Sequence, residues 1–263
     1  MDLKLKGNLA LVTGSTSGIG KGIASSLLKE GARVVINSFS QAEIDSVRDE
    51  MSALGEVYFM VADITDTASV NKMIDDIYKI GELDIVVNNV GFWQGKDFWD
   101  FTDKDWQKMM DLNFYGAVRT LRACLPRMIK RNYGRIINIA SEVAMKPLPD
   151  MIPYSVAKTA VVSLSRGLAE VTRGKNITVN SVLPGPTWTP GEEASQKILA
   201  EDAGKTIDQQ VVDFFKECEP TSLVGRFLKI EEVASAVTFY CSPVASAATG
   251  VAILIDGGII RHI

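Results

Sequence analysis

The residues with the clearest chemical potential are a tyrosine and a lysine four positions apart, Tyr154 and Lys158. On a helix, side chains at this spacing leave the same face, one turn apart. A phenol ordinarily titrates near pH ~10, and a neighbouring ammonium group favours the phenolate and lowers that pKa. The pair therefore predicts a proton-transfer device if the rest of the chain builds a site around it. The alternative is an ordinary helix surface.

The chain around this pair alternates short apolar runs with helical segments. This alternation is typical of a parallel sheet with helices on both faces, whose ligands bind at the carboxyl ends of the strands. We therefore predict an α/β fold in one domain spanning residues 1–263, a Rossmann-type doubly wound parallel sheet of about seven strands. Strands are expected near residues 8–13, 33–37, 57–61, 83–91, 135–141, 177–183 and 251–255, and helices near 21–30, 41–54, 67–80, 106–131, 153–173 and 231–240.

The helix that carries Tyr154 shows an apolar stripe at helical spacing. We expect this stripe to be its buried face. Its members are Ala157, Ala160, Leu164, Leu168 and Val171.

A glycine-rich turn follows the first expected strand. Residues 13–20 read T-G-S-T-S-G-I-G and lead into a helix. Gly14 permits a tight turn, Gly18 and Gly20 let the backbone approach phosphates, and the helix N-terminus supplies N–H donors. Strand, turn and helix in this order predict a pyrophosphate site; the alternative is a Gly/Ser-rich loop without a ligand.

Composition excludes several classes of protein. The net charge is −4 without a basic stripe, so no nucleic-acid partner is expected. The single histidine, His262, argues against histidine triads and histidine-rich metal sites, so no metal is expected. No apolar run is long enough to cross a bilayer, and the N-terminus lacks an apolar signal core. With three scattered cysteines, the sequence predicts a cytoplasmic protein without a membrane partner.

Two segments stand apart from the strand and helix pattern. Residues 187–221 are polar and helix-prone, which predicts a mobile insertion that serves as a substrate lid. Residues 92–101 are rich in aromatics. These aromatics, Trp93 among them, together with Trp188, line an apolar substrate pocket or pack in the core or a subunit interface, and the sequence leaves both readings open.

Taken together, the motifs resemble the short-chain dehydrogenase/reductase family over nearly the whole chain. Residues 13–20 are similar to its T-G-x-x-x-G-I-G turn, and residues 88–91 to its N-N-A-G motif. Tyr154 and Lys158 match the Y-x-x-x-K pair. Ser141, thirteen residues before the tyrosine, and Asn113 match the family's catalytic serine and asparagine. Pro184-Gly185 and Asp256-Gly257-Gly258 match later signatures.

The resemblance implies an NAD(P)-dependent oxidoreductase that interconverts a ketone or aldehyde with an alcohol by hydride transfer. It implies Tyr154 as general acid/base, Ser141 as the group that orients the substrate oxygen, and Lys158 as the group that lowers the tyrosine pKa and holds the nicotinamide ribose. Asn113 would anchor a water that links Lys158 to solvent. The implied cofactor-binding residues are Gly14, Thr16, Ser17, Gly18, Ile19, Gly20, Ser38, Asp63, Ile64, Asn89, Gly91, Tyr154, Lys158, Pro184, Gly185, Thr187 and Thr189.

The resemblance also bears on substrate and assembly. It includes 3-oxoacyl-acyl-carrier-protein-reductase-like members, and Arg131 and Arg173 are spaced like the basic residues that dock the carrier protein there. Glu142, directly after Ser141, is expected to face a small carbonyl or alcohol substrate. A homotetramer is expected, with helices 106–131 and 153–173 forming one interface. A catalytically silent cofactor-binding sensor or scaffold is the alternative.

The end of the second strand bears on NADP against NAD. A carboxylate there binds the 2′-hydroxyl of NAD and repels the 2′-phosphate of NADP. This chain has Ser38 at that position, and it lacks the basic residue that NADP-preferring members carry at the positions of Ser17 or Phe39. Asn37, Ser38 and Ser40 can donate hydrogen bonds to a phosphate, so NADP is predicted in preference to NAD.

Overall fold

The computed structural model describes residues 1–261, so His262 lies outside the described residues. Seven parallel strands form one sheet in this part of the chain, in the order β3-β2-β1-β4-β5-β6-β7. The predicted doubly wound parallel sheet is therefore confirmed. The strands are β1 (Leu9–Val12), β2 (Arg33–Ser38), β3 (Val57–Val61), β4 (Leu83–Asn88), β5 (Gly134–Ile139), β6 (Ile177–Pro184) and β7 (Ala252–Ile255).

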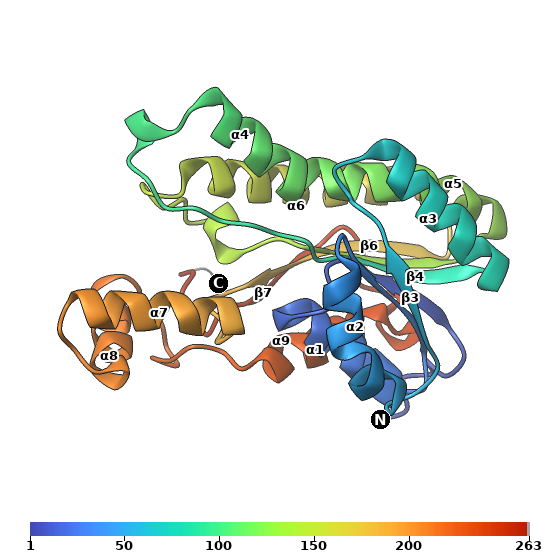
Figure 1. The fold of residues 1–263 in the computed structure, drawn as a ribbon. Helices are drawn as coiled ribbons and strands as arrows, with labels where there is room; N and C mark the ends of the chain where they lie inside the picture. Colours follow the sequence, from blue (N-terminus) through green and yellow to red (C-terminus); the bar gives the residue numbers. More distant parts are fainter. Residues whose placement is uncertain (262–263) are drawn as a thin grey trace.

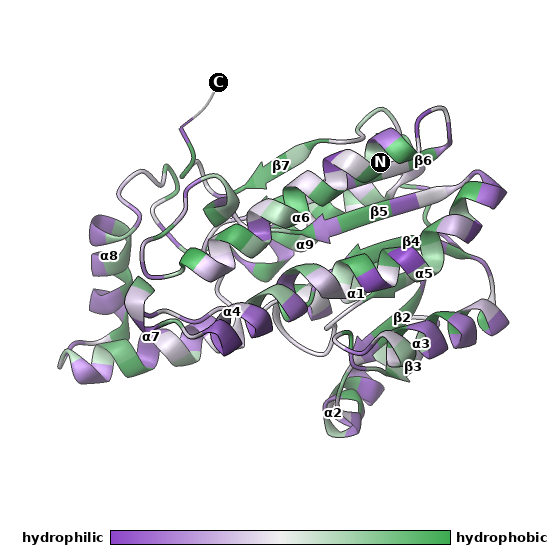
Figure 2. Cartoon of the chain, turned by 90° about the horizontal axis from the view of Figure 1, so that it is seen from above, coloured by the Kyte–Doolittle hydropathy of each residue, from purple (hydrophilic) through white to green (hydrophobic). Residues whose placement is uncertain are grey.

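Helices cover both faces of the sheet (Figure 1). One face packs against α1 (Gly18–Lys29), α2 (Gln41–Ser52) and α9 (Ile230–Cys241) through one hydrophobic cluster. The other face packs against α3 (Thr67–Ile80), α5 (Gly116–Arg131) and α6 (Ile152–Val171) through a second cluster. Figure 2 shows β4 and β7 as mainly hydrophobic, whereas hydrophilic positions interrupt β5. Within the described residues, no helix combines the length and apolarity needed to cross a membrane.

The helix expected at 106–131 is three segments. The first, α4 (Asp103–Met110), follows a capping box formed by Thr102 and Asp105. A π-helical stretch, Asp111–Tyr115, follows and holds Asn113 before α5 begins. A π-helical turn inserts one residue into the helix, and such turns are frequent at functional sites. The periodicity of apolar residues in the sequence does not predict that insertion.

The predicted buried stripe of α6 is partly wrong. Ala157 is buried, but Val171 is 64% exposed, and Ala160, Leu164 and Leu168 are only half-buried. The buried face carries two polar side chains instead, because both bond to β5. Lys158 Nζ donates to the Ile139 carbonyl at 2.9 Å, and Ser165 Oγ accepts from Asn138 Nδ2 at 2.9 Å. Satisfied polar groups can be buried at little cost, so they rotate the helix away from its most apolar stripe.

Residues 187–221 contain α7 (Pro190–Asp202) and α8 (Ile207–Glu217), in keeping with their helix-prone composition. Both helices project beyond the carboxyl edge of the sheet (Figure 1, lower left). The side chain of Thr189 caps α7 by accepting from the backbone of Glu192 at 3.2 Å, and Thr206 forms a capping box for α8.

Candidate active site

The glycine turn joins β1 to α1. Gly14 and Gly18 have φ angles of 60° and 54°, the left-handed region that glycine adopts without steric cost. Helix α1 begins at Gly18 rather than near Lys21, since its first helical bond runs from Lys21 N to Ser17 O at 3.1 Å. The N–H groups of residues 18–20 therefore precede the helical ladder and are suited to donate to a phosphate.

Asn89 shapes this turn from the neighbouring strand. Its Nδ2 donates to the carbonyls of Thr13 and Gly14 at 3.1 and 3.0 Å, and its backbone N–H donates to Thr13 Oγ1 at 3.0 Å. A Cβ at Gly20 would lie 2.4 Å from that Nδ2. The side-chain amide of Asn89, a predicted cofactor-binding residue, thus holds the glycine turn in place.

Sequence reasoning missed a carboxylate at the end of β2. Glu43, in the first turn of α2, accepts from Ser38 Oγ and, at 3.1 Å, from Thr16 Oγ1. An acidic residue in the first turn after a strand end was the available signal. Glu43 therefore joins the two predicted cofactor residues from the glycine turn and from β2.

Asn37 was predicted to donate to a phosphate, but its side chain bonds within the sheet instead. It is buried, and its Nδ2 donates to the Met60 and Ala62 carbonyls at 3.3 and 3.1 Å. This amide therefore connects the end of β2 to the end of β3 by hydrogen bonds. Ser40 is half-buried before α2, and Ser17 is exposed at the N-cap of α1.

Asp63 and Ile64, both predicted to bind the cofactor, differ in exposure. Asp63 is exposed, and its carboxylate accepts from the backbone and the hydroxyl of Thr65, both at 2.8 Å. Ile64 is buried, and a Cβ at Gly116 would lie 2.2 Å from its Cδ1. Ile64 therefore packs beneath the start of α5, and Asp63 is the member at the surface.

The turn after β6 lies against the glycine turn. Gly185, which follows Pro184, donates to the Ile255 carbonyl at 2.9 Å, and Thr187 Oγ1 donates to the Gly185 carbonyl at 2.9 Å. Thr189 Cγ2 lies 3.5 Å from the position of a Cβ at Gly18. Two turns far apart in sequence thus enclose the same carboxyl edge of the sheet.

The four predicted catalytic residues gather beside these turns. Ser141 lies two residues after β5, Tyr154 and Lys158 lie one turn apart on α6, and Asn113 sits in the π-helical stretch. Lys158 Nζ is 5.5 Å from the centre of the Tyr154 ring. A Cβ at Gly91 would lie 3.3 Å from that Nζ and 3.2 Å from Asn113 Oδ1, so glycine leaves room for both groups.

Burial dominates the electrostatics of Tyr154 and Lys158. Desolvation raises the pKa of Tyr154, the negative charge of Glu142 raises it further, and a hydrogen bond with Ser141 offsets part of this. Burial lowers the pKa of the Lys158 ammonium to about 8. The prediction that Lys158 lowers the tyrosine pKa is wrong here, because burial outweighs it and the ammonium donates to the Ile139 carbonyl. Tyr154 therefore keeps its proton at neutral pH.

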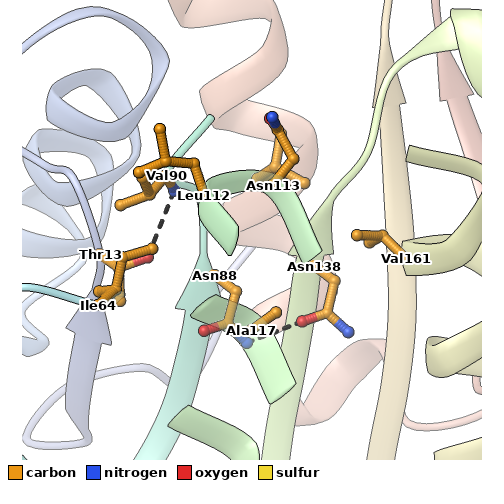
Figure 3. A pocket seen from close by; sticks show the side chains of 10 residues that line it. Thr13, Ile64, Asn88, Val90, Leu112, Asn113, Ala117, Asn138 and Val161 are labelled. Carbon is orange, nitrogen blue, oxygen red and sulfur yellow. Dashed lines mark hydrogen bonds between the residues drawn. The ribbon is translucent and has the colours of Figure 1, made fainter. Parts of the chain in front are cut away.

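Asn113 fixes the backbone next to Gly91. Its Oδ1 accepts from Phe92 N at 3.1 Å, while its Nδ2 donates to the carbonyls of Phe92 and Met109 at 2.8 and 3.0 Å. A cavity of about 10 Å³, the size of one water, lies beside it and is lined by Thr13, Asn88 and Asn138 among others (Figure 3). Asn88 Nδ2 donates to Asn138 Oδ1 at 2.8 Å, which ties β4 to β5.

Glu142 is a second carboxylate whose setting the sequence does not reveal. It is 6% exposed, and Ser141 Oγ donates to its Oε2 at 2.6 Å. Burial raises the pKa of Glu142 to about 7, partly offset by that hydrogen bond. Next to it, Lys146 forms an ion pair with the buried Glu219, which follows α8. The loop after Ser141 is thereby tied to the end of the 187–221 segment.

The aromatic residues divide between surface and core. Trp93 is 43% and Trp99 88% exposed, whereas Trp188 packs on Phe227, with ring centres 5.1 Å apart. Phe227 also stacks on Phe214 of α8. Phe227, in the segment before α9, therefore packs against both Trp188 and α8.

The two predicted docking arginines have internal partners. Arg131 pairs with Asp84 at 2.7 Å and donates to the Leu83 carbonyl at 2.9 Å, and Arg173 pairs with Glu170. Arg131 is thus committed to the base of β4. In the described part of the chain, no group of three or more His, Cys, Asp or Glu side chains is placed to hold a metal ion.

Comparison with known proteins identifies the family of the chain. The family model described as enoyl-(acyl carrier protein) reductase matches residues 14–260. The uncharacterized oxidoreductase YvrD of Bacillus subtilis (strain 168) is 50% identical over 263 residues, which cover 100% of both chains. The 3-oxoacyl-[acyl-carrier-protein] reductase FabG of Aquifex aeolicus is 32% identical, covering 98% of this chain and 99% of that protein.

A solved structure has nearly the same fold. L-sorbose reductase from Gluconobacter frateurii, complexed with NADPH and L-sorbose, superposes with a TM-score of 0.94 at 31% identity, covering 100% of both chains. The family match extends over almost the entire chain, and the related proteins are oxidoreductases. The chain belongs to the short-chain dehydrogenase/reductase family and is an NAD(P)-dependent oxidoreductase.

Proposed function

We propose that this protein interconverts a small ketone or aldehyde with an alcohol, with Tyr154 as the general acid/base. The observation that carries the proposal is the gathering of Ser141, Tyr154 and Lys158 between the turns after β1 and β6. A glycine turn that follows β1, with N–H groups that precede the helical bonds of α1, fits the pyrophosphate of a dinucleotide. When bound, the reduced nicotinamide supplies the hydride.

The protein's own part in reduction is to deliver a proton and to hold the substrate oxygen. Tyr154 keeps its proton at neutral pH, so its phenol can protonate the oxygen as the carbonyl becomes an alcohol. Ser141 lies beside it and donates a second hydrogen bond to the same oxygen. The Lys158 ammonium, cationic below a pKa of about 8, would hold the nicotinamide ribose, as the family resemblance implies. Asn113 holds the backbone wall next to Lys158 and, with the adjacent cavity, provides for a water relay.

We propose NADP as the preferred cofactor. The absence of a carboxylate at Ser38 itself supports this choice, as does the NADPH bound by the related L-sorbose reductase. Glu43 opposes it, because its carboxylate occupies the hydroxyls of Ser38 and Thr16. These bonds must open before a 2′-phosphate can use the two hydroxyls.

We further propose one domain, 1–263, in which residues 187–221 form the substrate lid. In support, α7 begins next to the glycine turn at Thr189, and Glu219 pairs with Lys146 close to Ser141. Pro184, Gly185, Thr187 and Thr189 would then bind the nicotinamide side of the cofactor. The candidate substrates are ketoses, 3-oxoacyl thioesters and other ketones.

A homotetramer and a cytoplasmic location are also proposed. The outer face of α6 exposes Val156 at 44% beside a groove of about 360 Å³ lined by Pro147, Ile152 and Ala160, which suits a helix-to-helix interface. Sedimentation that showed only a monomer would contradict the tetramer. The free, exposed thiol of Cys218 is in keeping with a reducing compartment.

Turnover with a panel of carbonyl compounds tests the function. The panel is L-sorbose, acetoacetyl-CoA and a cyclic ketone, each with NADPH and NADH. Tyr154→Phe is expected to lower kcat about 10²- to 10⁴-fold, while cofactor binding, followed by nicotinamide fluorescence, persists. If the wild type binds cofactor but reduces nothing, and Tyr154→Phe behaves identically, the silent sensor or scaffold becomes the better interpretation.

A further inference from the structure

Ser141 has a single hydroxyl proton, and in this structure that proton points at a carboxylate. Ser141 Oγ donates to Glu142 Oε2 at 2.6 Å and accepts from Val143 N at 3.4 Å. A hydroxyl can donate only one hydrogen bond. While Glu142 is ionised, Ser141 must therefore break a charge-assisted bond before it can donate to a substrate oxygen.

The surroundings of Glu142 disfavour its ionised form. The side chain is 6% exposed, and Tyr154 of α6 lies on the side of Ser141. Lys146, whose positive charge acts on Glu142, is itself paired with Glu219, whose side chain is 3% exposed. Among residues 1–261, no Lys or Arg side chain lies within ion-pair distance of Glu142. A buried carboxyl group without its own counter-ion favours the protonated state.

We propose that Glu142 is a positioning residue that works as the protonated acid. Its carboxyl O–H donates a hydrogen bond to Ser141 Oγ, which leaves the Ser141 hydroxyl free to donate to the substrate oxygen. The inference rests on the proposed carbonyl reduction. The carboxyl proton stays on Glu142 throughout turnover, so the proton balance of the reaction is unchanged. Burial brings the pKa of Glu142 to about 7, so this arrangement is sensitive to pH near neutrality.

The ion pair between Lys146 and Glu219 links residues 187–221 to the pKa of Glu142. The charge of Glu219 raises the pKa of Glu142, and that of Lys146 lowers it. Glu219 follows α8 and Lys146 follows Ser141 in the same loop as Glu142, so a movement that parts the pair changes the field at Glu142. The orientation of the Ser141 hydroxyl is in this way coupled to the position of residues 187–221.

The pH profile of kcat/KM for reduction tests the inference, measured with the best substrate among L-sorbose, acetoacetyl-CoA and a cyclic ketone. The wild type should lose activity about tenfold per pH unit above the pKa of Glu142, about 7. In Glu142→Gln the amide N–H donates to Ser141 at every pH, so activity should hold until Lys158 deprotonates at about 8. Glu142→Ala should be slow at every pH because it cannot direct the Ser141 hydroxyl.

Further variants separate the possible outcomes. Glu219→Gln removes a negative charge beside Glu142 without touching Ser141, so the alkaline limb should move to lower pH. In a Ser141→Ala background, Glu142→Gln should change nothing further. Superimposable profiles for the wild type and Glu142→Gln, or an unmoved limb in Glu219→Gln, would overturn the inference while leaving carbonyl reduction standing. A wild type that binds cofactor but reduces none of the three compounds overturns the proposed function, and the inference with it.

Discussion

Two serines at strand ends each donate to a glutamate, and they do so in opposite environments. Ser38 donates to Glu43, which is exposed on α2, whereas Ser141 donates to Glu142, which is 6% exposed. An exposed carboxylate acts on a ligand mainly through its charge, while a buried one is governed by where its proton lies. A serine and a glutamate therefore suit different roles at the two sites. The Ser38–Glu43 pair suits selection of the cofactor, and the Ser141–Glu142 pair suits control of the Ser141 hydroxyl.

Removing each serine should separate these two roles most clearly. Ser141→Ala deletes the proposed hydrogen bond to the substrate oxygen, so kcat/KM for the carbonyl substrate should fall about 10²- to 10³-fold. Ser38→Ala should instead act on the cofactor KM, by less than about tenfold, because it loses one neutral hydrogen bond. Steady-state kinetics with both substrates varied measures this contrast. Equal losses of kcat in the two variants would refute the division of roles.

Burial of Glu142 should also cost stability in a pH-dependent way. Its pKa is raised from 4.5 to about 7, so the folded protein keeps a proton that the unfolded chain releases. Below pH 4.5 both states are protonated and there is no cost; as pH rises, stability falls, and the full cost is reached above about 7. Glu142→Gln escapes this, so it should raise the free energy of unfolding by about 3 kcal/mol at pH 8 and by almost nothing near pH 4.5.

Chemical denaturation at the two pH values provides the measurement, and Glu43→Gln is its matched control. Because Glu43 is exposed, its replacement should change stability by less than about 1 kcal/mol at either pH. If Glu142→Gln were equally stabilising at both pH values, packing rather than the proton would explain the gain.

The parts predicted from sequence are those that local chemistry determines. Helix α3 occupies 67–80 as expected, since a capping aspartate, Asp66, precedes it and Gly81 ends it. The glycine turn follows from Gly14 and Gly18, which adopt the positive φ angles that a tight turn requires. The one-turn spacing of Tyr154 and Lys158 predicts that they share one helix, and both lie on α6, whereas Ser141 is predicted as a site residue only through the family resemblance.

The parts that escaped prediction depend on tertiary neighbours. The face of α6 is set by Asn138 and Ile139 of β5, which give Ser165 and Lys158 their partners. The raised pKa of Tyr154 comes from burial, which no spacing reveals. Glu43 and Glu142 are ordinary surface residue types in the sequence, and only the fold places each beside its serine. Charged groups at a site are thus harder to foresee than the backbone that carries them.

Cofactor choice offers the smallest effect and the most direct test of Glu43. Replacing it with glutamine removes a negative charge beside Ser38 and Thr16, where a 2′-phosphate would lie. A charge pair near the surface is worth about 1 kcal/mol or slightly more, so the ratio of NADPH to NADH affinity should rise roughly tenfold.

Nicotinamide fluorescence titrations of wild type, Glu43→Gln and Glu142→Gln measure that ratio at one ionic strength. The two variants remove the same charge, and of the two glutamates Glu43 is the one that bonds Ser38 and Thr16, so Glu142→Gln should leave the ratio at the wild-type value. Raising the salt concentration should shrink the effect of Glu43→Gln, because an exposed charge is screened. A ratio that rises in both variants would trace the effect to net charge, and one that rises in neither would show that the Glu43 carboxylate turns away when cofactor binds.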